Sequence, residues 1–208
     1  MADRRIERGN RTRQLVLRRA VDLASVEGLD GLSLGRLAGE LELSKSGVFA
    51  LFGSKEDLQL ATIGAATEVF VEHVIEPANA APPGIDRLWR TCDGWLTYSR
   101  DRVFPGGCFF YAASAEFDAR SGKVHDALVA ARANWSRHLE RTARDAQRAG
   151  EVAPGTDIPQ LVFELAAFLE MANAESVLHD EFTCYDKASR AVLNRLRAAA
   201  TDPAALPE

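Results

Sequence analysis

Apolar residues recur at helical spacing along most of the chain, and no segment alternates apolar and polar residues as a half-buried strand would. In the first segment Val16, Ala20, Leu23 and Ala24 fall on one face, and Gly28 ends the pattern. The pattern predicts an all-α fold with nine helices. These cover residues 11–28, 33–41, 44–52, 55–76, 85–100, 108–118, 122–149, 158–178 and 185–199.

Residues 33–58 combine two short predicted helices with a tight turn between them. Ser33 can cap the first helix, whose apolar positions Leu34, Leu37, Ala38 and Leu41 follow helical spacing. Two short helices held at a fixed angle are a common device for entering a DNA groove. The segment therefore predicts a helix-turn-helix.

The second short helix carries the candidate DNA contacts. Ser44 can cap it, and it begins Lys45-Ser46-Gly47, where small residues permit close approach to DNA and the lysine supplies positive charge. Ser54-x-x-Asp57 is a capping-box pattern that starts a third helix. Val48, Leu51 or Phe52, Leu37, Ala38 and Leu41 are expected in the core. The predicted DNA-binding residues are Ser33, Ser44, Lys45, Ser46, Gly47, Phe49 and Lys55.

This stretch resembles the DNA-binding domain of the tetracycline-repressor (TetR) family of bacterial regulators. The matching positions are Ser33, Leu37-Ala38, Leu43-Ser44, Gly47, Val48-Phe49-Ala50-Leu51-Phe52, Lys55 and Leu58. The chain departs from the pattern at Glu42, where a turn glycine is usual, and a left-handed non-glycine residue there costs about 1–2 kcal/mol. Phe49 and Leu51 replace residues that commonly bear a hydroxyl or imidazole, so the resemblance implies fewer phosphate contacts here.

Breaks in the pattern divide the chain into parts. We expect a helix-turn-helix domain over residues 1–54, a helical effector-binding and dimerisation domain over residues 55–200, and a disordered tail over residues 201–208. The arginine-bearing residues 1–9 are interpreted as a disordered leader or as an arm that touches the minor groove. Pro77 and the turn Pro82-Pro83-Gly84 end the helix predicted over residues 55–76.

The charge of the chain is divided along its length. The net charge is −5, yet residues 1–55 hold ten Lys/Arg against seven Asp/Glu, and residues 56–208 hold fifteen against twenty-three. The predicted DNA-binding end is therefore the basic one. The three cysteines show no paired spacing, and apolar stretches end before about 18 residues, so we expect a reduced, cytoplasmic protein with no membrane segment. Cys108 is a candidate redox sensor or a buried structural thiol.

The last two long helices carry more apolar and small residues than one buried stripe requires. A helix that is apolar on two sides is buried on two sides, which favours either a partner subunit or a monomer core. The resemblance implies a four-helix dimer interface at the same place. The predicted interface residues are Leu165, Leu169, Ala172, Val192 and Leu196.

Aromatic residues gather in the middle helices with a few polar neighbours, which is the composition of a small-molecule pocket. The same residues at helical spacing also suit a plain core, and the resemblance favours a pocket for an unknown effector. The candidate ligand-binding residues are Trp89, Cys92, Trp95, Phe110, Glu116, Trp135, His138, Phe168 and Asn173.

Catalytic chemistry finds no support in the sequence. The four histidines are scattered, no Cys/His cluster suits zinc, and no glycine-rich phosphate loop is present, so no catalytic residue, metal or cofactor is predicted. The favoured interpretation is a homodimeric, DNA-binding transcriptional regulator, a repressor released from a palindromic operator by a small molecule. The alternative is an all-α ligand carrier or enzyme with a vestigial helix-turn-helix.

Overall fold

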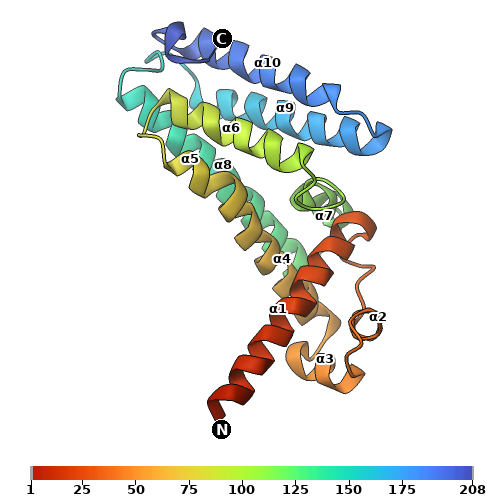
Figure 1. Cartoon of the computed structure of the whole chain (residues 1–208). Coiled ribbons are helices and arrows are strands. Elements are labelled where there is room, and N and C mark those ends of the chain that lie inside the picture. Colours follow the sequence, from red (N-terminus) through yellow and green to blue (C-terminus); the bar gives the residue numbers. More distant parts are fainter. Residues whose placement is uncertain (1, 208) are drawn as a thin grey trace. The chain divides into compact units, whose positions relative to one another are not determined.

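The computed structural model describes residues 2–207, of which residues 2–6 and 8 are described by their backbone alone, and these residues are helical almost throughout (Figure 1). Their only β feature is an isolated bridge between Val152 and Ala200. The first helices are α1 (Ala2–Glu27), α2 (Leu34–Glu40), α3 (Lys45–Phe52) and α4 (Lys55–Phe70). The later ones are α5 (Glu76–Asn79), α6 (Ile85–Arg100), α7 (Phe109–Phe117), α8 (Lys123–Arg148), α9 (Ile158–His179) and α10 (Thr183–Ala199).

The all-α prediction is confirmed, and most predicted helix ends agree with the observed ends within about two residues. Helix α1 is longer than predicted because it begins at Ala2, so residues 2–9 continue the helix instead of forming a leader. The tail also differs, since Pro203–Ala205 forms a 3-10 turn and Leu206 is buried. Thr201 Oγ1 donates a hydrogen bond to Gly150 O at 2.7 Å, which fixes the start of this segment.

The predicted helix over residues 55–76 contains a π-helical turn, Val71–Ile75, and continues into α5. Pro77 lies in the first turn of α5 rather than ending the helix. A proline has no N–H to donate and its ring collides with the carbonyl four residues earlier, here that of His73. The wider turn directly before Pro77 relieves that collision.

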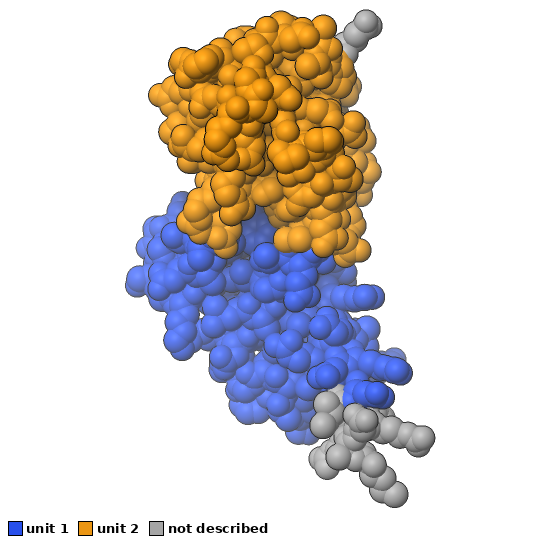
Figure 2. All heavy atoms as spheres, turned by 90° about the vertical axis from the view of Figure 1, so that its left-hand side faces the viewer, with its two compact units in different colours: residues 1–69, 104–131 blue, residues 70–103, 132–208 orange. Residues whose placement is uncertain are grey.

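The chain forms two compact units, which Figure 2 colours separately. Unit 1 comprises residues 1–69 and 104–131, and unit 2 comprises residues 70–103 and 132–208. Unit 1 thus holds α1–α3, α4 up to Val69, α7 and the start of α8, because α7 packs against α1. These units do not follow the predicted boundary at residue 54.

One helical run among the described residues, Lys55–Asn79, is long and apolar enough to cross a membrane by length and composition. This is weak support for a membrane segment, because core helices of globular proteins pass the same test. The run also contacts other helices, since the π-helical turn and α5 both pack against α6.

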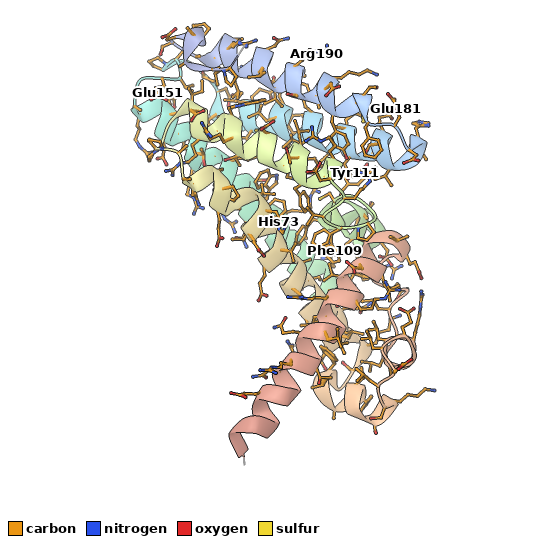
Figure 3. All side chains as sticks on the ribbon, viewed as in Figure 1. His73, Phe109, Tyr111, Glu151, Glu181 and Arg190 are labelled. Carbon is orange, nitrogen blue, oxygen red and sulfur yellow. The ribbon has the colours of Figure 1, made fainter. Side chains whose placement is uncertain are left out.

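Unit 2 contains a carboxylate that caps a helix from outside it. Helix α6 has no side-chain cap of its own, and its N-cap residue is Gly84. Glu151, labelled in Figure 3 in the segment that follows α8, accepts a hydrogen bond from Ile85 N at 2.7 Å. A Cβ at Gly84 would lie 2.5 Å from the same carboxylate oxygen, so the glycine makes room for this cap.

Candidate DNA-binding surface and effector domain

Serine side chains begin both short helices of the predicted motif, as the sequence indicated. Ser33 Oγ accepts a hydrogen bond from Arg36 N at 3.1 Å, and Ser44 Oγ accepts one from Gly47 N at 3.1 Å. Each bond satisfies one of the free amides at a helix start. A Cβ at Gly47 would lie 2.8 Å from Ser44 Oγ, so this glycine also keeps the cap of α3 open.

Helix α3 has one buried side and one exposed side. Val48 and Phe52 are buried, together with Leu37 and Ala38 of α2, so the predicted core is confirmed at these four positions, whereas Leu41 and Leu51 are half-buried. The exposed side chains are Lys45, Ser46, Phe49 and Ala50. Phe49 is 56% exposed, which is unusual for a phenylalanine in a folded unit.

The turn between α2 and α3 is left-handed at Glu42, whose φ is 55°. The prediction of a non-glycine residue in this conformation is therefore confirmed. The turn is closed by backbone bonds, since Leu43 N donates to Ala38 O at 2.8 Å and Glu42 N donates to Gly39 O at 3.3 Å. These bonds hold Glu42 in a conformation that its side chain disfavours.

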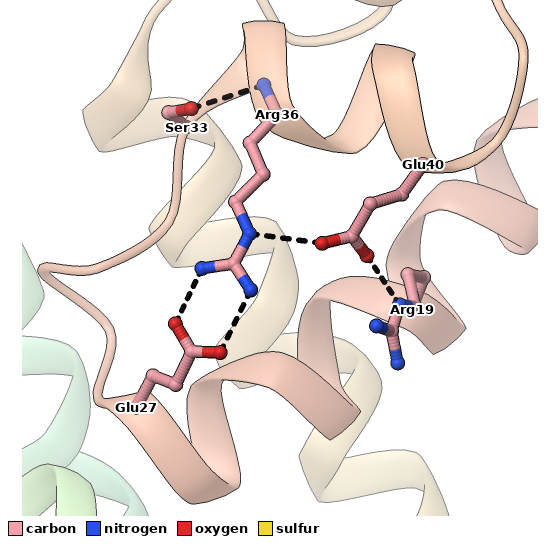
Figure 4. Close-up of polar contacts among 5 residues, drawn as sticks. All are labelled: Arg19, Glu27, Ser33, Arg36 and Glu40. Carbon is pink, nitrogen blue, oxygen red and sulfur yellow. Dashed lines mark hydrogen bonds and ion pairs between the residues drawn. The ribbon is translucent and has the colours of Figure 1, made fainter.

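Arg36 joins α1 and α2 through two carboxylates (Figure 4). Its guanidinium binds Glu27 in bidentate fashion, with one N–O distance of 2.7 Å, and donates to Glu40 Oε1 at 2.9 Å. Arg19 Nε donates to the other oxygen of Glu40 at 2.6 Å. The hydrogen bond from Arg36 lowers the pKa of Glu27, and those from Arg19 and then Arg36 lower the pKa of Glu40.

Lys55, a predicted DNA contact, is bound within unit 1. Its Nζ lies 2.6 Å from Asp30 O and 2.8 Å from Asp30 Oδ1. Arg120 Nη1 donates to the second carboxylate oxygen of Asp30 at 3.2 Å. The hydrogen bonds from Lys55 and then Arg120 lower the pKa of Asp30. An ammonium has three N–H donors, so one donor of Lys55 remains for a phosphate.

Glu116, a predicted ligand contact, instead holds the turn that follows α1. Its Oε2 accepts a hydrogen bond from Leu29 N at 2.7 Å, and its Oε1 accepts one from Asp30 N at 2.8 Å. A Cβ at Gly28 would lie 2.7 Å from Oε2. We name the group formed by Glu116, Gly28, Leu29 and Asp30 the Glu116 clamp. Through it, α7 fixes the turn whose Asp30 also binds Lys55.

The nine candidate ligand residues do not gather in one unit. Phe110 and Glu116 belong to unit 1, and the other seven belong to unit 2. Trp89, Cys92 and Trp95 of α6 are buried, while Trp135, His138 and Phe168 are half-buried. Burial raises the pKa of the Cys92 thiol to about 12, so this cysteine is protonated at neutral pH. Cys108, the candidate redox sensor, is buried as well.

Asn173 lies in a buried polar cluster of unit 2 that the sequence did not reveal. Its Oδ1 accepts a hydrogen bond from Ser99 Oγ at 2.9 Å, and Ser99 Oγ lies 2.8 Å from the hydroxyl of Tyr185. Arg102, in the left-handed conformation with φ 52°, donates to Tyr185 at 2.9 Å and to Ser176 Oγ at 3.1 Å. These bonds indicate that Asn173 has a structural role in this unit.

A chain of aromatic rings links three helical segments of unit 2. Phe70 meets Trp135 at 5.2 Å and Tyr98 at 5.5 Å between ring centroids, both edge to face, and Trp95 meets Tyr98 at 6.3 Å. His138 stacks on Trp135 with 13° between the rings. We call these five residues the aromatic chain. Its polar end is the imidazole, whose Nε2 is buried with no hydrogen-bond partner among the described residues.

The electrostatic environment of His138 favours its neutral form. Burial is the largest cause that lowers the pKa of this imidazole, and the positive charges of Arg141 and Arg87 lower the pKa further. A neutral imidazole has one donor and one acceptor nitrogen. The aromatic chain therefore combines apolar ring surface with a neutral imidazole at one end.

The five predicted interface residues on α9 and α10 are buried inside unit 2. Leu165, Leu169, Ala172, Val192 and Leu196 are all at most 2% exposed. The exposed apolar side chains of α9 lie on a different face of the helix from these buried residues. They include Phe163 at 69%, Met171 at 60% and Leu178 at 75%, and Ala167 and Ala174 continue their stripe at helical spacing.

Sequence reasoning overlooked Phe70 and Tyr98, the binding of Arg36 to Glu27, and the clamp role of Glu116. The spacing of Tyr98 three residues after Trp95 and of Glu40 four residues after Arg36 would have placed those pairs on one helix face. The partners of Glu116 are 86 and 87 residues away along the chain. Only the folded structure brings them together.

Two family models match the chain. The model described as "Bacterial regulatory proteins, tetR family" matches residues 16–62, and the one described as "Tetracyclin repressor-like, C-terminal domain" matches residues 84–192. The first match contains α2 and α3, and the second extends from the start of α6 into α10. No curated protein sequence matches the chain.

Solved structures share the fold at low identity. A TetR transcriptional regulator from Chloroflexus aurantiacus J-10-fl is 22% identical, with a TM-score of 0.86 over 93% of this chain and 98% of that chain. A transcriptional regulator from Saccharomonospora viridis in complex with choline is 18% identical, with a TM-score of 0.76 over 92% and 98%. AibR in complex with isovaleryl coenzyme A and operator DNA is 17% identical, with a TM-score of 0.69 over 86% and 95%.

Proposed function

Because the chain belongs to the TetR family of bacterial regulatory proteins, we propose that it is a homodimeric transcriptional repressor that a small-molecule effector releases from a near-palindromic operator. The observation that carries the proposal is the exposed face of α3, which follows a serine cap and starts with Lys45. One fold neighbour was solved with operator DNA, which supports the same use of this motif. The cytoplasm, where the DNA lies, is the proposed location.

The proposed DNA contacts are the seven residues named from the sequence, with their roles refined by the geometry. Lys45, Ser46 and Phe49 are exposed on α3, and Gly47 permits close approach of its backbone. Ser33 and Ser44 set the starts of α2 and α3, and their hydroxyls can also meet phosphates. Lys55 contributes one free ammonium donor beside its bonds to Asp30.

The proposed dimer uses the exposed apolar stripe of α9. Phe163, Met171 and Leu178 are large side chains exposed by 60% or more along one helix. An exposed apolar stripe on a regulator that must present two recognition helices is best covered by a second copy of the same face. A twofold dimer places the two α3 helices about 34–36 Å apart, so the two half-sites of the operator would lie one DNA turn apart.

The proposed effector site is the aromatic chain of unit 2. Apolar walls with a few polar groups are typical of small-molecule sites. The two neighbours solved with ligands hold choline and isovaleryl coenzyme A, which differ in charge and size, so the fold does not name the effector. The effector would bind more tightly to the dimer geometry that does not fit DNA. The ratio of its affinities for the two dimer geometries sets the largest possible fall in operator affinity.

Salt-dependent binding to duplex DNA tests the proposed DNA contacts. Lys45→Ala is expected to weaken binding to all duplexes and to lower the salt slope by about 1, because one phosphate partner is lost. Lys187→Ala, an exposed lysine of α10, is the matched control and should leave both quantities unchanged. Equal affinity and slope for wild type and Lys45→Ala would contradict the assignment. No binding to any duplex would favour the ligand carrier or enzyme instead.

Sedimentation tests the proposed dimer separately. At about 10 μM the wild type should be a dimer, because an interface of ordinary size is saturated there. Leu178→Glu should produce monomers with unchanged helix content, whereas Val129→Glu, a control at an apolar position of α8 that is 52% exposed, should stay dimeric. A monomeric wild type would refute the homodimer.

A further inference from the structure

The exposed face of α3 is unusually poor in side chains that read base edges through hydrogen bonds. Bidentate recognition of bases uses Arg or Lys for guanine and Asn or Gln for adenine, and Glu or Asp accepts from cytosine. Of these types, α3 offers only Lys45, at its first residue. The rest of the exposed face consists of Ser46, Phe49 and Ala50.

The apolar part of this face lies in the middle of the helix. Phe49 follows Lys45 by four residues, and Ala50 follows Ser46 by four, so the four side chains form one continuous surface. An eight-residue helix is about 12 Å long, close to the width of the major groove. Of the four exposed side chains, Phe49 and Ala50 lie nearest the middle of the helix.

Among the described residues, Phe49 does not belong to the buried core of α3. Its neighbours on the buried side, Val48 and Phe52, supply the core contacts of α3 and are at most 7% exposed. Phe49 is 56% exposed on the same helix. A large apolar side chain presented to water by a helix that carries the DNA contacts points to an apolar partner in the groove.

We propose that Phe49, assisted by Ala50, recognises thymine through the 5-methyl group in the major groove. The thymine methyl is the one apolar group that the four bases present there, and apolar side chains contact it in protein–DNA complexes. Ser46 and Lys45 flank this contact and bind phosphate or a single base-edge atom. The inference rests on the proposed DNA-binding function and adds which base the centre of each half-site must hold.

Replacing thymine with uracil isolates the contact, because it removes the methyl group and leaves base pairing and the O4 acceptor intact. Burial of one methyl-sized group corresponds to about a fourfold change in affinity. Two symmetric half-sites, each with one contacted methyl, would give about a fifteenfold loss.

The experiment starts from duplexes with a randomised central segment, from which the full-length chain selects its preferred sequence. The enriched duplex is then made with thymine throughout and with uracil at one symmetric pair of positions at a time. The affinity of the wild type should fall about fifteenfold with uracil at one pair of positions, and it should not change with uracil at pairs outside the half-sites. Phe49→Ala should bind the thymine and uracil duplexes equally, and Phe49→Leu should keep part of the difference. Val129→Ala, a change at an apolar position 52% exposed, should keep all of it.

Two results would overturn the inference. One is an enriched duplex whose affinity does not change with uracil at any position. The other is a Phe49→Ala protein, folded by circular dichroism, that retains the full uracil penalty. Failure of the proposed function looks different, because then no duplex would be enriched and binding would not depend on sequence or salt.

Discussion

The Glu116 clamp gives a quantitative prediction for stability. The substitutions are Glu116→Ala, which removes both acceptors, and Glu116→Gln, which keeps the shape and loses the charge. The two bonds, at 2.7 and 2.8 Å, satisfy the amides of Leu29 and Asp30 directly after α1 ends. A hydrogen bond to a charged group contributes about 1.5–3 kcal/mol, and the half-exposed position of Glu116 places it at the lower end.

We therefore expect Glu116→Ala to lower the free energy of unfolding by about 3 kcal/mol. Glu116→Gln should lower it by about 1–2 kcal/mol, because an NH2 group replaces one of the two oxygens and cannot accept from the amide that this oxygen binds. Urea unfolding followed by circular dichroism measures both values. Asp118→Asn, an exposed carboxylate at the end of the same helix, is the control and should change stability by less than about 0.5 kcal/mol. Unfolding of both Glu116 variants within that margin of wild type would refute the clamp.

Three further changes test other parts of unit 1. Glu42→Gly should raise the free energy of unfolding by up to about 1 kcal/mol. The left-handed strain removed from the folded state is larger than the stabilisation of the unfolded state by the extra conformational entropy of glycine. A destabilised variant would contradict this prediction. Gly106→Ala should cost about 3 kcal/mol in urea unfolding, because its Cβ would lie 1.8 Å from Ser25 O, and a neutral effect would show that the backbone yields freely. The pKa values of Glu27 and Glu40 are lowered from 4.5. The stability that these two carboxylates contribute to the fold is therefore present above pH 4.5 and is lost as the pH falls through the lowered values. A thermal unfolding midpoint that is the same at pH 5 and at pH 3 would contradict this prediction.

Local signals account for what the sequence predicted well. The caps by Ser33 and Ser44 and the left-handed Glu42 each depend on residues within four positions along the chain. Such interactions are decided by short-range geometry, and the spacing of residue types reveals them. The helix over residues 85–100 follows the turn Pro82-Pro83-Gly84, which is another local signal.

Long-range packing accounts for what the sequence left hidden. The aromatic neighbours of Glu116 in the sequence suggest a pocket carboxylate, yet its partners lie on the turn after α1. The apolar character of Leu169 and Val192 suits a dimer interface and a core equally, and their exposure of 1% or less shows that they are buried within unit 2. A helix that is apolar on two sides does not reveal which side faces the same chain and which faces a partner.

Binding of the full-length chain to its selected duplex, measured over a range of salt concentrations with the stoichiometry determined in parallel, tests the proposed function most directly. The prediction is one dimer per near-palindromic duplex, with half-sites about one DNA turn apart and an affinity that falls steeply as salt rises. Selection that enriches no sequence, together with duplex affinity that does not depend on salt, would contradict the assignment of this chain as a DNA-binding repressor.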